Sequence, residues 1–149
     1  MKRYIRGPLA ALLSVLPASA LAAADIAMHR DPGCGCCEQW AAQVKAQFGR
    51  QVRIIDDVNR SAFARQRGVP VDLASCHTAV IDGMSFEGHV PIADMKRALA
   101  QHPKGMHGLA VAGMPMGSPG MEMPGMKSDA YDVIAFGPGG RRVFAHHQG

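Results

Sequence analysis

The sequence predicts a protein of the α/β class in which a central mixed sheet is flanked by helices. Three observations predict this class. Strand-like and helix-like segments alternate up to about residue 101, a Gly/Pro/Met-rich stretch without regular period follows, and two strand-like segments end the chain. The length of 149 residues suits one domain. We therefore expect a single domain over residues 25–149 with a long Met-rich loop at 103–129.

The first 24 residues differ in composition from this domain. "MKRYIRG" is a basic start, and "PLAALLSVLPASALAAA" is an apolar run that ends in small residues. The pattern is typical of a secretory signal peptide cleaved after Ala20 or Ala24, and the apolar run is too short to span a bilayer comfortably. We expect a periplasmic protein with no stable membrane anchor after cleavage.

The basic character of the chain comes mostly from this leader. The whole chain has 16 basic and 12 acidic residues, a formal net charge of +4. Without Lys2, Arg3 and Arg6 the domain has 13 basic and 12 acidic residues, a net charge of +1. A nearly neutral domain without a basic cluster gives no electrostatic reason to expect nucleic-acid binding.

The first half of the domain alternates between strand and helix patterns. Residues 25–30 indicate a strand, and a turn rich in Asp, Pro and Gly follows it. Residues 37–48 predict an amphipathic helix, because apolar side chains recur at spacings of three and four, and Gly49 closes it. Residues 51–58 indicate a second strand, and residues 59–69 suit a short helix.

The second half contains two predicted hairpins. Residues 76–90 indicate a hairpin around Asp82-Gly83, a dipeptide that favours tight turns between strands. Residues 91–102 predict a helix with proline in its first turn. Residues 131–147 contain two strand patterns joined by a Gly/Pro turn, after the loop at 103–129.

The order strand, helix, strand, helix, hairpin, helix is a thioredoxin-like layout. In that layout the loop before the first hairpin strand lies against the turn that opens the first helix. Cys76 occupies the former position, and Cys34, Cys36 and Cys37 occupy the latter. We expect the four sulfurs to lie close together.

Three crowded cysteines indicate a binding site more than a structural framework. Thiolates are stabilised at a helix N-terminus, and Cys34 and Cys37 have the C-x-x-C spacing of a redox disulfide. Cys36 adds nothing to disulfide exchange, whereas a third thiolate helps to ligate or bridge metal ions. A thiol-disulfide oxidoreductase with Cys34 as nucleophile and Cys37 as resolving thiol remains one alternative. A structural zinc site is another.

Copper is the metal that the composition favours. Soft thiolate and thioether ligands select Cu(I), and Met114-x-Met116 and Met121-x-Met123 are spaced like extracytoplasmic methionine copper motifs. One Cu(I) ion cancels one of four thiolate charges, so we hypothesise a small polynuclear copper-thiolate centre. The predicted loop contains six methionines: Met106, Met114, Met116, Met121, Met123 and Met126.

Four histidines are weaker candidates. His77, next to Cys76, could ligate a metal or orient a ligand. His89 precedes a predicted helix, and we interpret it as a cap or hydrogen-bonding residue there. His146 and His147 lie near the chain end, which suggests a frayed tail, although paired histidines can capture Cu(II).

Four stretches, "DPGCGCCEQW", "GVPVDLASCHTAVIDG", "FEGHVPIADMKRAL" and "GLAVAGMPMGSPGMEM", resemble the signatures of a protein family. It is an exported metal-binding family of formerly unknown function that includes the periplasmic copper-resistance protein CopG. The similarity runs from about Met28 to Phe144. It implies a thioredoxin-like fold, a role in periplasmic copper tolerance that could involve a change of copper's oxidation state, and copper bound by the cysteines at 34, 36, 37 and 76.

Taken together, the sequence predicts a periplasmic protein that holds Cu(I) and buffers it or passes it to other copper-handling proteins. Whether the protein stores copper or also catalyses its oxidation and reduction stays open at this level. So do the disulfide oxidoreductase and structural zinc alternatives.

Overall fold

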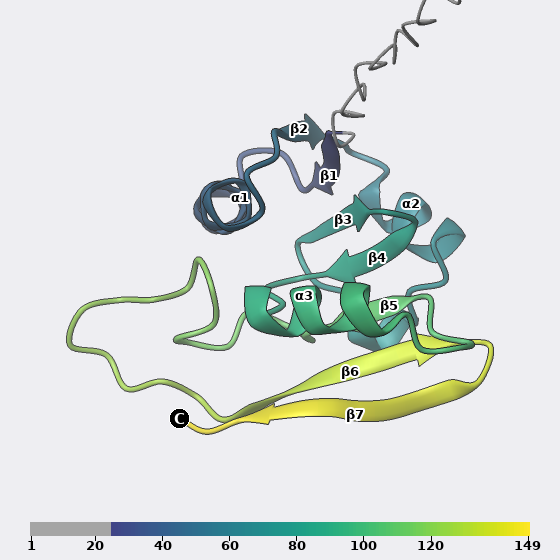
Figure 1. Ribbon diagram of the computed structural model, residues 1–149. Coiled ribbons are helices and arrows are strands. Elements are labelled where there is room, and N and C mark those ends of the chain that lie inside the picture. The colour runs from purple at the N-terminus through teal and green to yellow at the C-terminus, as the bar shows by residue number, and fades with distance from the viewer. Residues whose placement is uncertain (1–24) are drawn as a thin grey trace, which may run out of the picture.

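The computed structural model describes residues 25–149, and the predicted signal peptide at 1–24 lies outside the described residues. It confirms the predicted α/β class, with a mixed seven-stranded sheet and three α-helices in the described part of the chain (Figure 1). The more specific thioredoxin-like arrangement stays a prediction.

The helices and strands follow the predicted order. The helices are α1 (Gly35–Phe48), α2 (Arg60–Gln66) and α3 (Ile92–Gln101), with a short 3-10 turn at Val71–Leu73. The strands are β1 (Ile26–Arg30), β2 (Val52–Asp56), β3 (His77–Ile81), β4 (Met84–Glu87), β5 (Gly108–Ala110), β6 (Tyr131–Gly137) and β7 (Gly140–His147).

The sheet has the order β2-β1-β3-β4-β5-β6-β7. β1 pairs with β2 in parallel and with β3 antiparallel, and β3 and β4 form the hairpin predicted around Asp82-Gly83. β5 lies parallel to β4, and the hairpin of β6 and β7 completes the other edge. The pairing of β1 with β3 matters most for function, because it places the end of β1 beside the start of β3.

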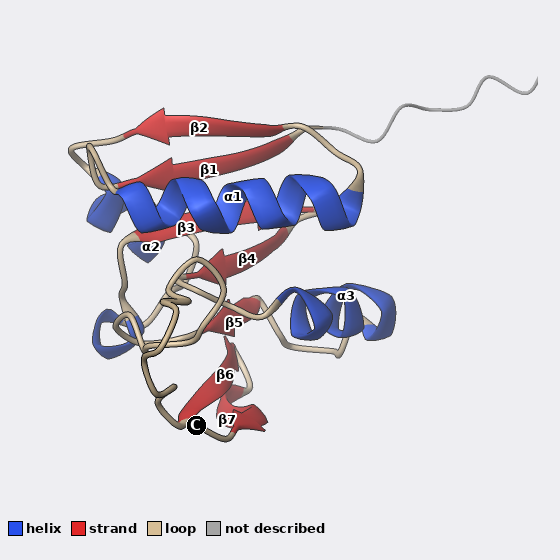
Figure 2. Cartoon of the chain, turned by 90° about the vertical axis from the view of Figure 1, so that its left-hand side faces the viewer, coloured by secondary structure: helices blue, strands red, loops and turns tan. Residues whose placement is uncertain are grey.

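The main core lies between the sheet and α1, which lies lengthwise over β1 and β3 (Figure 2). The buried face of α1 is the apolar stripe predicted from its sequence, and α1 ends at Gly49, whose φ of 63° suits glycine. Strand alternation directs one set of side chains from each strand into this core. Its largest buried members are Trp40, Phe86, Ile26, Met28, Ile81, Met95 and Leu109.

The opposite face carries α2 and a smaller apolar cluster built on Ala64, Leu73 and Phe136. This face also holds polar groups, because the side chains of β4 that alternate with Phe86 point toward α2. Glu87 is 0% exposed and contacts Arg60 of α2 there.

Two predictions for the second half of the chain were wrong. The range 103–129 is not a continuous loop, because β5 pairs with β4 and β6 inside it. Three residues are too short to give a periodic signal, and only the sheet on both sides defines the strand. His146 and His147 are not in a frayed tail, since both belong to β7 and pair with Asp132 and Asp94.

The segment between β5 and β6, residues 111–130, is ordered by contacts with the rest of the protein and by its own turns (Figure 2). Gly113 accepts a hydrogen bond from the Ser75 hydroxyl, and Pro119 accepts one from His89. Gly120 approaches α1 so closely that an added Cβ would lie 2.7 Å from the carbonyl oxygen of Cys36.

Helices long and apolar enough to cross a membrane are absent from the described residues.

The close packing of Gly120 on α1 gives a test of this loop. Gly120 and Gly125 both have positive φ, +85° and +79°, but an added Cβ meets backbone only at Gly120. We expect Gly125→Ala to lower the free energy of unfolding by about 1 kcal/mol through backbone strain, and Gly120→Ala by about 2–4 kcal/mol because overpacking is added. Urea unfolding gives both values. Backbone hydrogen exchange should become faster over residues 112–130 in the Gly120→Ala variant. Equal losses of unfolding free energy for the two substitutions would contradict the close packing of Gly120 on α1.

Candidate metal centre

The first half of the site is the turn between β1 and α1. Gly33 (φ 76°) allows the chain to reverse, and the Cys34 amide donates to the carbonyl oxygen of Asp31. The Arg30 guanidinium donates to the Cys34 carbonyl oxygen at 2.8 Å and to Glu38 at 2.7 Å. These contacts fix Cys34 at the N-cap of α1, so that Cys36 and Cys37 fall in its first turn.

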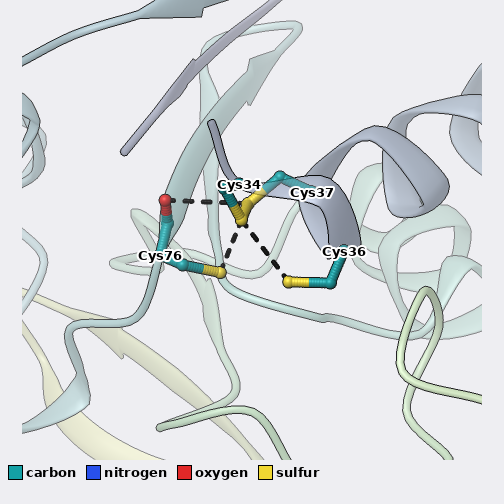
Figure 3. Close-up of side chains that lie close together, drawn as sticks. All are labelled: Cys34, Cys36, Cys37 and Cys76. Atoms are coloured by element: carbon teal, nitrogen blue, oxygen red, sulfur yellow. Dashed lines mark hydrogen bonds between the residues drawn. A yellow bond between two sulfur atoms is a disulfide. The ribbon is translucent and has the colours of Figure 1, made fainter. Parts of the chain in front are cut away.

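The second half is the residue before β3. In the antiparallel pair of β1 and β3, Arg30 is opposite His77, so Cys76 lies beside the turn that follows Arg30. The Asp31 amide donates to the Cys76 carbonyl oxygen at 3.0 Å. The predicted meeting of a remote cysteine with the trio is therefore present (Figure 3).

The four Sγ atoms lie within 4.8 Å of one another. Cys34 and Cys37 form a disulfide, and Cys36 and Cys76 are free thiols. Cys36 Sγ lies 3.4 Å from Cys34 Sγ, and Cys76 Sγ lies 3.4 Å from Cys37 Sγ. Two thiolates that share a tetrahedral ion at about 2.3 Å lie roughly 3.8 Å apart. The spacing of the sulfurs therefore suits metal binding once the disulfide is reduced.

His89, which sequence reasoning interpreted as a helix cap, belongs to this site. Its Nε2 lies 3.3 Å from Cys76 Sγ and its Nδ1 lies 2.8 Å from the carbonyl oxygen of Pro119. A signal for this position was present in the sequence. The hairpin pairs Thr78 with Glu87. Continuing this register outward sets His77 opposite Gly88 and then Cys76 opposite His89.

His77, predicted as a weaker ligand, is fully buried next to Cys76. Its Nδ1 lies 3.5 Å from Cys76 Sγ, and its ring packs against Trp40 at a centroid distance of 4.5 Å. Its Nε2 is a buried nitrogen without a hydrogen-bond partner among the described residues. Burial lowers the pKa of His77 and His89, so both rings stay neutral at pH 7 and can offer lone pairs.

Burial also controls the reactivity of Cys76. It raises the pKa of this thiol to about 11, so the protonated form dominates at neutral pH when no metal is bound. A protonated thiol is a poor nucleophile. A metal ion that replaces the proton removes this penalty, because ligating thiols are deprotonated outright. The environment of Cys76 therefore favours metal binding over disulfide exchange.

A buried ion pair joins the two halves of the site from the opposite face of the sheet. Arg60 donates to Asp31, at the start of the cysteine turn, and to Glu87 at 3.0 Å. Glu87 also accepts hydrogen bonds from the Ser75 amide at 2.7 Å and from the Thr78 hydroxyl. Burial raises the pKa of Glu87, while these three donors favour its charged form. The pair holds the segment that presents Cys76 against the turn that presents the trio.

The methionine candidates lie on the segment at 111–130, which covers the start of α1. Met114 and Met123 are 54% and 57% exposed, and Met116 and Met121 are half-buried. Met121 follows Gly120, the residue that contacts α1 next to Cys36. His146 and His147 lie apart from the sulfurs on β7, where adjacent side chains point to opposite faces of the sheet.

The chain is similar to known proteins over most of its length. Two solved structures named copper resistance protein CopG, Form 1 and Form 2, are similar to this chain. Form 1 is 42% identical with a TM-score of 0.77, and the match covers 86% of this chain and 100% of that one. Form 2 is 42% identical with a TM-score of 0.75, and the match covers 83% and 97%.

A family described as "Protein of unknown function, DUF411" matches residues 73–121. That range contains Cys76, His77, His89 and the first half of the segment at 111–130. A search of curated proteins finds no significant match.

The raised pKa of Cys76 predicts its alkylation profile. In the folded metal-free protein, the rate of carboxamidomethylation at Cys76 should stay low through pH 8 and rise about tenfold per pH unit toward pH 11, as the thiolate forms. In urea the rate should level off above about pH 8.5, the ordinary thiol value. Peptide mass spectrometry measures both profiles. A folded-state plateau below pH 9 would contradict the effect of burial.

The ion pair of Arg60 and Glu87 predicts a strong effect on stability. Arg60→Met leaves the Glu87 carboxylate buried without its cation, so the free energy of unfolding should fall by about 3 kcal/mol. Arg141→Met is the matched control, because Arg141 pairs with the exposed Asp72. This substitution should lower the free energy of unfolding by less than about 1 kcal/mol. Adding Glu87→Gln to Arg60→Met should recover part of the loss. Urea unfolding measures these changes. Similar losses of unfolding free energy for the two arginine substitutions would contradict a stabilising role of the buried Arg60–Glu87 ion pair.

Proposed function

Because the chain belongs to the family of the copper resistance protein CopG, we propose that it binds copper on its four clustered cysteines and contributes to copper resistance in the periplasm. The single observation that carries the proposal is the convergence of four Sγ atoms within 4.8 Å. In the reduced protein these become four soft ligands from two segments far apart in the chain. The leader-like start of the sequence supports the proposed location.

Cu(I) is the proposed oxidation state for the reduced site. Thiolates prefer soft monovalent copper to Cu(II) or Mg²⁺. Four thiolates with a single Cu(I) would leave three negative charges in a partly buried place, which is costly. Bridging of several Cu(I) ions by the sulfurs would neutralise them. We therefore propose a polynuclear centre, with the methionines of 111–130 as a route for capture and release.

The disulfide favours a second activity at the same place. When the Cys34 and Cys37 thiols form their S–S bond they release two protons and two electrons. Two Cu(II) ions that each accept one electron become two Cu(I) ions, and the step balances without another reactant. Such a protein would interconvert the oxidation states of copper as well as bind it. A protein disulfide as the substrate is less favoured, since the remaining thiols already lie 3.4 Å from each disulfide sulfur.

Copper loading tests the proposal. Anaerobically reduced protein, saturated with Cu(I) and desalted, should retain more than one copper per chain by elemental analysis. Cys36→Ser and Cys76→Ser should each lower that number, because each removes a bridging ligand. His146→Gln is the control, since this exposed imidazole pairs with Asp132 away from the sulfurs.

Three results would contradict the proposal. One copper per chain with no dependence on the cysteines would exclude the thiolate centre. Zinc instead of copper in protein taken from the periplasm of copper-fed cells would favour a structural zinc site. A third result would favour the oxidoreductase: the wild-type protein binds no copper, and the Cys36→Ser variant keeps full disulfide reductase activity.

A further inference from the structure

We propose that the disulfide form of the protein has a site for one copper ion, made of Cys76, His77 and His89, which shares Cys76 with the four-cysteine centre. With Cys34 and Cys37 bonded to each other, only Cys36 and Cys76 remain as thiols. Cys76 has two imidazoles beside its sulfur, and the three ligand atoms lie within 4.8 Å of one another. The inference rests on the proposed copper function but concerns a different redox state and ligand set.

Both sulfur–nitrogen distances at Cys76 fit a shared metal ion. A metal bonded to a thiolate at about 2.3 Å and to an imidazole nitrogen at about 2.0 Å, at a tetrahedral angle, holds the two atoms roughly 3.5 Å apart. In the structure Cys76 Sγ lies 3.3 Å from His89 Nε2 and 3.5 Å from His77 Nδ1. Each imidazole is therefore close enough to Cys76 Sγ to share an ion with it, and the three ligand atoms lie within 4.8 Å of one another.

Hydrogen bonding prepares His89 as a ligand. The Pro119 carbonyl oxygen can only accept, so the proton of the neutral ring is on Nδ1 and the lone pair is on Nε2, facing Cys76. Histidine ligands in metal sites commonly donate their other N–H to a backbone carbonyl in this way. The contact also ties the ligand to the segment at 111–130, which makes that segment part of the site.

The surroundings of His77 point the same way. Its ring is 0% exposed, Nδ1 lies 3.5 Å from Cys76 Sγ, the Gly88 backbone also acts on the ring, and Nε2 has no hydrogen-bond partner among the described residues. Leaving a buried imidazole without a strong hydrogen bond is costly for a purely structural residue. A metal bond to Nδ1 would replace the weak contact with the Cys76 thiol by a strong one.

The donor set determines which copper the site takes. One thiolate with two imidazoles is the ligand combination of copper sites that cycle between Cu(II) and Cu(I). The four-thiolate centre of the reduced protein favours Cu(I) alone. The disulfide form would therefore accept Cu(II), the ion that the reduced protein consumes in the proposed redox step.

The single tryptophan of the chain gives a direct readout. The Trp40 ring lies 4.5 Å from the His77 ring, so a paramagnetic Cu(II) ion at this site should quench its fluorescence. The test uses the full oxidised domain carrying Cys36→Ser, which leaves Cys76 as the free thiol. We expect quenching to be complete at one equivalent of Cu(II), with a new thiolate-to-copper absorption band. Co(II), which the thiol does not reduce, should also give a thiolate charge-transfer band, and this band should reach its maximum at one equivalent of Co(II).

Substitutions separate the proposed ligands from general copper binding. His89→Gln should weaken Cu(II) binding at least tenfold and leave the fold intact by circular dichroism. Cys76→Ser should remove the thiolate band. His107→Gln is the matched control, an exposed imidazole away from the sulfurs, and should bind like the parent protein.

The outcomes distinguish this proposal from the proposed function. Absence of Trp40 quenching at one equivalent, or equal Cu(II) binding by His89→Gln and the parent, would overturn the three-residue site. Multiple Cu(I) binding by reduced protein would then still support the polynuclear centre. Conversely, one Cu(II) per oxidised chain with no Cu(I) on the reduced cysteines would support this site and exclude the thiolate centre.

Discussion

The antiparallel pairing of β1 with β3 is the constraint on which the site depends. Because Arg30 is opposite His77, the end of one strand and the start of the other coincide, and the residues just outside the pair meet. The cysteine turn enters α1 at this point, and Cys76 is the last residue before β3. A shift of register by one residue would turn Cys76 and His77 to the wrong faces. The sulfurs are thus positioned by backbone hydrogen bonds before any metal binds.

Three other elements secure this junction. The ion pair of Arg60 and Glu87 joins its two halves from the face of the sheet that carries α2. The hairpin of β3 and β4 returns His89 to the level of Cys76. The segment at 111–130 closes the site through Pro119 and Gly120. Each of these contacts is buried or partly buried, so the ligands are preorganised and little ordering is needed when an ion binds.

The site combines two kinds of donor around Cys76. On one side lie the sulfurs of the cysteine turn, which change from a disulfide and one thiol to three thiols on reduction. On the other side lie two imidazoles, whose pKa values burial lowers so that both are neutral at pH 7. Cys76 belongs to both sets. Under the proposed function, such a protein would match its ligands to the oxidation state of copper, because soft sulfur favours Cu(I) and imidazole also accepts Cu(II).

The sequence by itself determined the α/β class, the positions of the helices and hairpins, and the placement of Cys34, Cys36 and Cys37 at a helix start, because these follow from local periodicity and turn residues. It also indicated Cys76 as their partner through the order of elements. Only the tertiary structure decided that β5 is a strand, that His89 faces Cys76 instead of capping α3, and that His146 and His147 pair with aspartates. These features depend on contacts between residues far apart in the chain. Such contacts are set by strand register and packing, which leave no periodic signal in the residues themselves.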